Sequence, residues 1–449
     1  MAKQIWLDVT TLHNWFRPAV GIIRMELECA RYVLLECGGH ARFCQFDCGR
    51  GMYYEVHRDE IITLVKRLDS NIHSDKEGSD SLATILEWKV KKLIREWIRY
   101  LSTQNQERIV RLLLRFKYIL ERAGSKAYIL VSKLSRVRFH RPHYREEARF
   151  LSGDVYITLG LDWEYKDLRK LYTIKKKTGI KMLGICYDII PIKFPHLCSG
   201  QVAKIFSHYF VELAWCADRI LCISENSRQD LVQFLKSANG PQPQLEVIKL
   251  GSEIKTKAGT VDESIQDICR NPFILYVSTI ERRKNHEVLY RAYTRLIEGG
   301  RRDLPRLVFV GMPGWGVSDL LSDIRFDPRI RGLIIQLNQV NDAELDLLYR
   351  HALFTVFPSL YEGWGLPVAE SLTYGRFCIA SNTSSLPEVG GDLVEYLDPL
   401  DLPAWVEQLA YYFDNPEEIK KREKKISSSY IPTKWVDAAR ALINHARNL

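Results

Sequence analysis

The chain of 449 residues lacks several features that would assign it to common classes of protein. None of its apolar runs approaches the roughly 18 residues that a membrane-spanning helix needs. Its ten cysteines include no Cys-x-x-Cys pair, and the closest two in the first half are Cys44 and Cys48. Zinc sites use closely paired ligands, so the spacing favours reduced thiols in a cytosolic protein. The N-terminal Met1–Asp8 leads directly into a predicted strand, without the apolar segment of a signal peptide.

Acidic residues are scarce in one segment. Residues 81–150 contain 17 Lys and Arg against six Glu and no Asp, a net charge of 17 − 6 = +11. The whole chain carries +9, so the remainder has 9 − 11 = −2 and is nearly neutral. A basic segment is therefore attached to a chain of otherwise ordinary globular composition, with 46% hydrophobic residues.

Apolar runs rich in β-branched residues alternate with helical patterns, which predicts βαβ units and parallel sheets. Twelve strands are expected, and they begin at Gln4, Ala41, Asp154, Lys181, Arg219, Leu245, Phe273, Arg306, Leu333, Leu353, Arg376 and Val394. The polar stretch 251–272 is expected to be a linker, and about 52–150 a helical insertion in the first sheet. The order predicts an α/β protein of two Rossmann-like, doubly wound domains that face each other across a cleft. The first domain would span 1–265 and the second 272–429, and a C-terminal helix, about 430–449, would pack back on the first.

The stretch Phe357–Glu370 carries the most chemical information. It follows a buried strand and precedes a helix whose first turn contains Pro367, a position that proline favours. Glu362 lies in the loop and Glu370 in the helix, at the edge of the sheet where open α/β sheets bind ligands. Gly363 and Gly365 allow the backbone to approach a ligand closely, and the helix N-terminus suits a diphosphate.

This stretch resembles the signature of retaining glycosyltransferases of family 4, which have the GT-B fold. Its flanks, Val340–Leu345 and Ser384–Gly391, are also similar to the family. The resemblance extends to Tyr276–Asn285, which is similar to the family's diphosphate loop, and to Val310–Trp315. Near the N-terminus, Val20–Arg24 resembles the glycine loop that faces the donor, which would include Gly21. About 52–150 has no counterpart in the family.

The resemblance implies a role for each matching residue. Glu370 would bind the ribose hydroxyls of a nucleotide-sugar donor, and Glu362 would hold hydroxyls of the transferred sugar. Arg283 and Lys284 would neutralise the diphosphate. Further donor contacts are expected from the loop and helix residues Gly363, Trp364, Gly365, Leu366, Ser384 and Ser385.

Two positions depart from the family pattern. Many relatives have an arginine where this chain has Thr279, so part of the phosphate clamp is missing or is supplied by Arg282. Tyr187 stands where a His-Asp pair is common, and it is either a packing residue or a sign of a donor without a 6-hydroxyl group. Asp188 beside it is expected to be a carboxylate that faces the donor or the acceptor.

The implied activity is a retaining transfer of a hexose or deoxyhexose, of mannose or rhamnose type, to a saccharide acceptor. We expect that acceptor to be lipid-linked and to belong to bacterial surface polysaccharide synthesis. No cofactor and no metal are expected, because nothing resembles an Asp-x-Asp motif; Asp162-Trp163-Glu164 is nearest and is expected to pack at a strand end. A sugar-nucleotide epimerase, a phosphorylase or a catalytically silent scaffold are the alternatives. Nucleic-acid binding has no recognisable module to support it.

The basic insertion has two open interpretations. Val90, Ile94, Trp97 and Leu101 recur at helical spacing, with Lys and Arg on the remaining sides. Such a helical hairpin can pack on the first domain, or residues of about 82–149 can bind the anionic inner face of the cytoplasmic membrane. The second interpretation predicts a cytoplasmic, peripheral protein.

Overall fold

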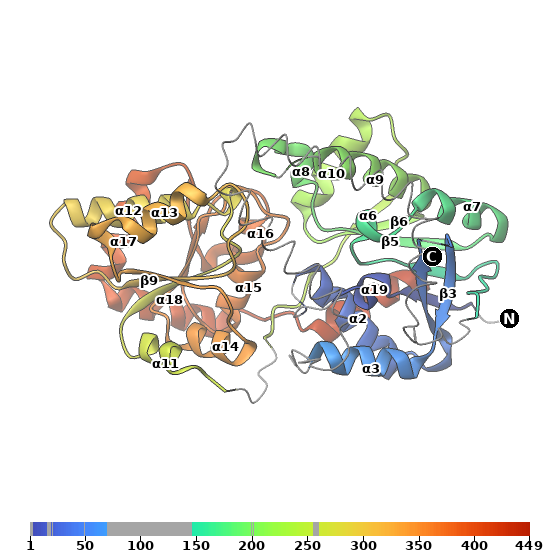
Figure 1. The fold of residues 1–449 in the computed structure, drawn as a ribbon, viewed down its shortest axis with the longest axis horizontal. Helices are drawn as coiled ribbons and strands as arrows, with labels where there is room; N and C mark the ends of the chain where they lie inside the picture. The colour runs from blue at the N-terminus through green and yellow to red at the C-terminus, as the bar shows by residue number, and fades with distance from the viewer. Residues whose placement is uncertain are drawn as a thin grey trace, which may run out of the picture. The chain divides into compact units, whose positions relative to one another are not determined.

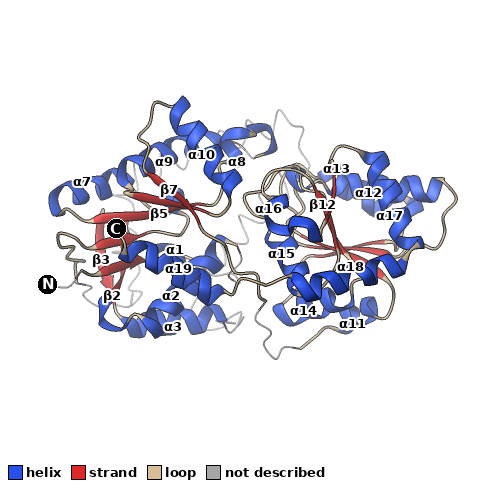
Figure 2. Ribbon diagram, turned by 180° about the vertical axis from the view of Figure 1, so that it is seen from behind, coloured by secondary structure: helices blue, strands red, loops and turns tan. Residues whose placement is uncertain are grey.

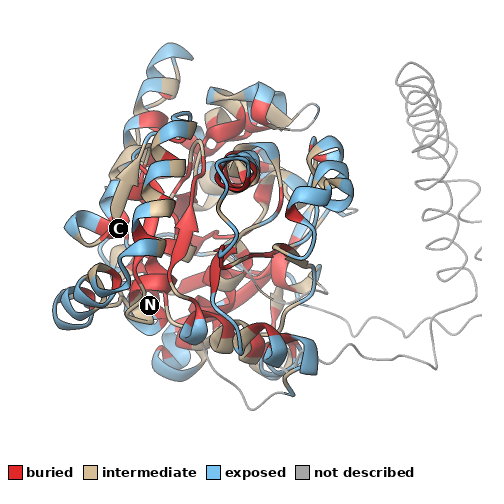
Figure 3. Ribbon diagram, turned by 90° about the vertical axis from the view of Figure 1, so that its left-hand side faces the viewer, coloured by how far each residue is buried: buried red, intermediate tan, exposed pale blue. Residues whose placement is uncertain are grey.

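A computed structural model of the chain describes residues 3–15, 19, 21–48, 50–69, 146–198, 200, 202–254 and 260–449. Two sheets form its framework, one of seven strands and one of six (Figure 1). All twelve expected strands are present, and helices cover both faces of each sheet (Figure 2). The central strands of each sheet are buried, the edge strands are partly exposed, and the outward helix faces are exposed (Figure 3), as expected of parallel sheets.

The first sheet has the strand order β3-β2-β1-β4-β5-β6-β7. Its strands are β1 Ile5–Asp8, β2 Ala41–Asp47, β3 Met52–Val56, β4 Val155–Ile157, β5 Lys181–Cys186, β6 Arg219–Cys222 and β7 Gln244–Val247. Its helices are α1 Thr10–His13, α2 Ile22–Glu36, α3 Arg58–Asp69, α6 Asp162–Tyr165, α7 Leu168–Thr178, α8 Ile190–Lys193, α9 Val202–Cys216 and α10 Glu225–Ser237. Helices α7, α9 and α10 lie on one face, and α2 and α3 on the other (Figure 1).

The start of the expected insertion belongs to this sheet. Strand β3 pairs antiparallel with β2, from Phe43 opposite Val56 to Asp47 opposite Met52, and Tyr53 is in the core. The expectation that about 52–150 is a helical insertion was wrong for β3. The alternation of apolar residues in this strand is short and stands directly before the basic segment, so the sequence analysis did not detect it. The stripe from Val90 to Leu101 and its basic neighbours lie outside the described residues.

The second sheet is entirely parallel and has the order β10-β9-β8-β11-β12-β13. Its strands are β8 Phe273–Val277, β9 Arg306–Val310, β10 Ile334–Leu337, β11 Thr355–Phe357, β12 Cys378–Ser381 and β13 Glu395–Leu397. Its helices are α11 Glu263–Cys269, α12 His286–Glu298, α13 Ser318–Phe326, α14 Asp342–His351, α15 Leu366–Thr373, α16 Leu386–Gly390, α17 Leu402–Asp414 and α18 Pro416–Ser429.

Strand β8 explains how helices pack on both faces of this sheet. Because side chains alternate along a strand, Ile274 and Tyr276 join the core under α12 and α17, whereas Phe273 and Leu275 join the core under α11 and α14. Helix α11 begins at Glu263, inside the stretch that the sequence predicted to be a linker. That interpretation missed it because only Ile265 and Ile268 of this short helix are buried.

The last helix, α19 Trp435–Arg447, packs against α2 of the first sheet. Its apolar face includes Ala439, Leu442 and Ile443, which are fully buried. Trp435 at its start donates its indole N–H to the carbonyl of Glu253, 3.1 Å away. Across the described residues, no helix is long and apolar enough to cross a membrane.

Candidate functional site

The loop between β11 and α15 carries the first candidate carboxylate. Gly365 begins α15 with φ of 116°, and a Cβ at this position would lie 2.4 Å from a methyl carbon of Leu386. Only glycine fits both the backbone angle and the space. The chain therefore turns sharply from loop to helix, with Glu362 in the loop and Glu370 inside the helix.

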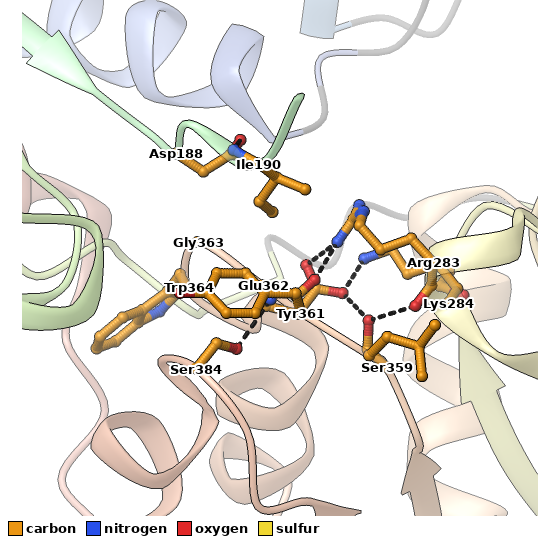
Figure 4. A network of polar contacts seen from close by, with 12 residues as sticks. Asp188, Ile190, Arg283, Lys284, Ser359, Tyr361, Glu362, Gly363, Trp364 and Ser384 are labelled. Carbon is orange, nitrogen blue, oxygen red and sulfur yellow. Dashed lines mark hydrogen bonds and ion pairs between the residues drawn. The ribbon is translucent and has the colours of Figure 1, made fainter. Parts of the chain in front are cut away.

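Glu362 is the centre of a buried ion-pair cluster (Figure 4). Its two carboxylate oxygens lie 2.8 Å from Arg283 Nη1 and 2.5 Å from Lys284 Nζ. The Ser359 hydroxyl donates to the same carboxylate. Burial alone would raise the pKa of Glu362, but the charges of Arg283 and Lys284 outweigh it and lower the pKa to about 2. The carboxylate is thus ionised at all physiological pH values.

Arg283 joins two loops that are distant in sequence. Its guanidinium pairs with Glu281 at 2.8 Å and donates to the carbonyl of Tyr361 at 2.6 Å. Its own carbonyl accepts the backbone N–H of Leu360 at 2.8 Å. The short 3-10 turn Arg282–Lys284 ends at Asn285, whose left-handed backbone starts α12. The basic turn after β8 is therefore held against the Glu362 loop by ion pairs and by a backbone hydrogen bond.

Glu370 lies in a separate environment. Burial raises its pKa to about 7, although a hydrogen bond from Tyr349 and the charge of Arg24 act in the opposite direction. The Tyr349 hydroxyl donates to Glu370 at 2.9 Å, and its ring stacks on Tyr374 with a centroid separation of 5.1 Å. Sequence reasoning missed Tyr349, which stands in no recognisable motif, whereas Arg24 belongs to the predicted glycine loop Val20–Arg24.

Ser384 and Ser385 support the Glu362 loop through their hydroxyl groups. Ser384 Oγ accepts the backbone N–H of Glu362 at 2.9 Å. Ser385 Oγ donates to the carbonyl of Trp364 at 2.7 Å and to that of Glu362 at 3.1 Å. The next residue, Leu386, begins α16, and its N–H bonds the carbonyl of Thr383.

Two segments of the first sheet reach the same loop. A Cβ on Gly363 would lie 2.4 Å from the Tyr187 carbonyl oxygen and 2.9 Å from the Asp188 Cβ. The Ser224 hydroxyl donates to the Gly363 carbonyl at 2.7 Å. Asp188 accepts the N–H of Ile190 at 3.0 Å (Figure 4), and burial raises its pKa although Arg283 opposes this. Gly363 was expected to let the backbone approach a ligand, and in the structure its missing side chain lets two backbone segments meet.

Tyr187 and Gly21 have local structural roles. The buried Tyr187 hydroxyl donates to the Leu159 carbonyl at 2.7 Å. Gly21 caps α2 with φ of 52°, a backbone angle that favours glycine, and nothing lies within 4 Å of an added Cβ. One turn later, Arg24 donates to the Glu253 carbonyl at 3.2 Å.

Asp162, which follows the carboxyl end of β4, forms an ion pair and a hydrogen bond with neighbouring side chains. It pairs with the buried Lys166 at 2.8 Å and accepts the Thr158 hydroxyl at 2.7 Å. Lys166 also pairs with Asp8 at 2.8 Å. In the part of the chain that the structure describes, no group of three or more His, Cys, Asp or Glu side chains is arranged to hold a metal ion.

Residues 263–429 match the family described as "Glycosyl transferases group 1". This segment is similar to the glycosyltransferase domains of that group. It contains Glu362, Arg283, Lys284, Glu370 and both serines of the adjoining loop. The Glu362 cluster and Glu370 therefore lie inside the matched segment, whereas Gly21, Arg24 and Asp188 come from the first sheet.

Several known proteins are similar to the chain over part of its length. The O-antigen chain mannosyltransferase B of Escherichia coli is 33% identical over 193 residues, which are 42% of this chain and 49% of that protein. The serotype-specific mannosyltransferase WbdA of Escherichia coli is 28% identical over 221 residues, 47% of this chain and 26% of that protein. The match thus spans about half the length of the first relative and about a quarter of the second.

Solved structures share the fold. The Anabaena protein HepE, in complex with UDP, has a TM-score of 0.50 at 13% identity, over 66% of this chain and 79% of that one. An Escherichia coli trehalose-6-phosphate protein bound with UDP-2-fluoro glucose also has a TM-score of 0.50, at 15% identity, over 66% of this chain and 73% of that one. With its two Rossmann-like sheets, the described chain has the GT-B fold, as the sequence predicted.

Proposed function

We propose that the chain is a retaining hexosyltransferase that moves a hexose or deoxyhexose from a nucleotide diphosphate sugar to a saccharide acceptor. The observation that carries the proposal is the Arg283–Lys284–Glu362 cluster, which lies inside the segment that matches the group 1 family. The acceptor would be lipid-linked, in bacterial surface polysaccharide synthesis. The similarity to O-antigen mannosyltransferases supports this context.

The transfer places negative charge on the departing diphosphate while the anomeric carbon gains oxocarbenium character. Arg283 and Lys284 would stabilise that charge, since they are held in place before the reaction and are shielded from solvent. Lys284 is buried, and burial lowers its pKa although Glu362 acts in the opposite direction. Glu362 would hold sugar hydroxyls and, being ionised, would favour the positive charge that develops on the ring.

Retention would follow a front-face route in which the leaving phosphate helps to deprotonate the acceptor. Glu370 would accept the ribose hydroxyls, and Asp188 would face the donor or the acceptor from the first sheet. No metal or cofactor enters this scheme.

Two sugars are the preferred donors. Mannose is favoured by the relatives named above. A 6-deoxyhexose such as rhamnose is favoured by Tyr187, because its hydroxyl already donates to the Leu159 carbonyl and cannot also donate to a 6-hydroxyl group. A panel of nucleoside diphosphate sugars, offered with a saccharide acceptor and followed by NMR of the product's anomeric configuration, tests donor and stereochemistry together.

The panel also separates the alternatives. An epimerase would convert the nucleotide sugar without an acceptor, and a phosphorylase would require inorganic phosphate. A scaffold would bind no nucleotide sugar. An inverted anomeric configuration would overturn the retaining route, and transfer of glucose or N-acetylglucosamine with no activity on mannose or rhamnose donors would overturn the donor assignment.

A further inference from the structure

A groove outside the Glu362 cluster lies between α7 and α9, which pack side by side on one face of the first sheet (Figure 1). It consists of two adjoining hollows of about 380 and 450 Å³, both lined by Leu168 and Glu212. Trp163 and Tyr209 line the first hollow, and Tyr172 and Trp215 the second. The groove shares no lining residue with the candidate donor site.

The aromatic rings of the groove are held in fixed orientations by their neighbours. Trp163 packs on Tyr209 at a centroid distance of 5.4 Å and an angle of 69°, and Tyr172 packs on Trp215 at 6.5 Å and 82°. Trp215 is nevertheless 58% exposed, which is unusual for so large an apolar side chain. Phe206 also packs on Trp163 at 4.7 Å and 50°, so the side of Trp163 that lines the hollow and the exposed Trp215 remain to pack against the apolar C–H face of a pyranose ring.

Hydrogen-bonding groups accompany these rings. Neither Trp163 nor Trp215 has a partner for its indole N–H among the described residues, and Lys204 has no described ion pair. His208 Nδ1 lies 2.9 Å from the Lys204 carbonyl, so that nitrogen carries the proton and Nε2 is left as an acceptor. The groove thus offers both donors and acceptors beside its aromatic faces, which suits sugar hydroxyls.

The charges of each hollow cancel. In the first, the carboxylates of Asp162 and Glu212 balance the ammonium groups of Lys166 and Lys204. In the second, Glu212 balances Arg169, whose guanidinium lies 3.7 Å away. A polyanion such as a nucleic acid or an anionic membrane would gain little from a surface without net charge, whereas a neutral polyhydroxylated chain needs none.

We propose that this groove binds a neutral oligosaccharide of at least two pyranose units, with one ring against Trp163 and another against Trp215. The proposal rests on the proposed function in one respect: the ligand would be the saccharide chain to which the sugar is transferred. The groove would retain that chain between transfers and act on acceptor binding without touching the reacting atoms.

The test is a binding titration of the full chain with a linear mannose tetrasaccharide, and in parallel with its glucose counterpart, by calorimetry or NMR. Trp215→Ala should weaken binding of the better tetrasaccharide about tenfold, since aromatic side chains dominate such contacts. Because Trp215 is mostly exposed, the variant keeps its packing, and a thermal melt verifies this. Trp163→Phe keeps an aromatic face but removes the indole N–H, and should have a smaller effect.

Phe326→Ala is the matched control, because Phe326 is 68% exposed and lies in α13, away from the groove residues. It should bind the tetrasaccharide as the unchanged protein does. In transfer assays, Trp215→Ala should raise KM for a long acceptor and leave kcat and the KM of a monosaccharide acceptor unchanged.

Three outcomes would overturn the proposal: equal binding by Trp215→Ala and Phe326→Ala, no binding of either tetrasaccharide, or loss of vesicle binding instead of saccharide binding in Trp215→Ala. Nucleotide-sugar binding, measured on the same samples, reports the proposed function separately. Tetrasaccharide binding without nucleotide-sugar binding would support the saccharide-binding groove and contradict the proposed transferase function.

Discussion

Lys284 and Glu362 are 78 positions apart in the sequence, yet the ammonium nitrogen of one lies 2.5 Å from a carboxylate oxygen of the other. Arg283 holds the second oxygen at 2.8 Å. Arg283 also pairs with Glu281 at 2.8 Å, so two cations and two carboxylates balance within the cluster. A bound diphosphate would compete with these carboxylates for Arg283 and Lys284 in the proposed reaction.

Removal of the Lys284 ammonium group tests whether its charge stabilises the departing diphosphate. Lys284→Ala should lower kcat by about 10²–10³, the scale expected when a transition-state charge stabiliser is lost. Diphosphate affinity should fall more than nucleoside monophosphate affinity. Arg291→Ala is the control, because Arg291 is an exposed cation of helix α12 and should leave kcat within about threefold. Equal losses in both variants would contradict the assignment.

Donor affinity should depend on pH through Glu370. Its pKa is about 7, above the ordinary 4.5, so the carboxyl is increasingly protonated as pH falls below 7. The ribose hydroxyls would need the ionised form as acceptor, so the dissociation constant for the donor should rise by up to about tenfold per pH unit below 7. The measurement is a titration of nucleotide binding between pH 5.5 and 8.5, chosen as a range of about three units around that pKa.

Tyr349→Phe gives a second test of the pH dependence assigned to Glu370. The lost hydrogen bond stabilised the ionised form of Glu370, so the midpoint of the pH dependence should move upward. Glu370→Gln should remove the dependence and weaken the donor by roughly 1.5–3 kcal/mol. A pH profile that is identical in all three proteins would exclude Glu370 as the titrating group.

Gly363 should not tolerate a side chain. Gly363→Ala would place a Cβ 2.4 Å from the Tyr187 carbonyl oxygen, and relief of that overlap should cost about 1–3 kcal/mol and reduce kcat. Gly39→Ala is the control, because an added Cβ there meets nothing within 4 Å. The check is chemical denaturation together with a transfer assay, and unchanged stability and turnover in Gly363→Ala would refute the close approach.

The basic insertion is tested on vesicles. Replacement of the cations in Lys89–Arg99 by glutamine should abolish binding to anionic vesicles, since each basic residue near such a surface contributes about 1 kcal/mol. Binding by the unchanged chain should weaken as salt is raised. Co-sedimentation with anionic and neutral vesicles is the measurement, and no preference for anionic vesicles would leave packing as the role of the insertion.

The strands and the two carboxylates were predictable because their signals are local. A buried parallel strand shows as an apolar run, and Glu362 and Glu370 follow such a run within one loop and one helix. β3 was not predictable, because its half-exposed residues Met52–Val56 alternate weakly. Tyr349 and Ser359 were missed for another reason: their partners are fixed by packing between segments, which no spacing in the sequence encodes.

The contact of α19 with α2 has a consequence for synthesis. Gly251 packs against Trp435, where an added Cβ would lie 2.5 Å from the indole ring, and the Arg219 guanidinium donates to the His445 carbonyl at 2.9 Å. The ribosome makes these partners of the first sheet only after the entire second sheet has been translated. The side of α2 that α19 covers therefore stays uncovered while about 170 residues of the second half are translated. At roughly 5–20 residues per second, this takes about ten to thirty seconds. A chaperone that holds nascent chains would find its binding site on α2 during that interval.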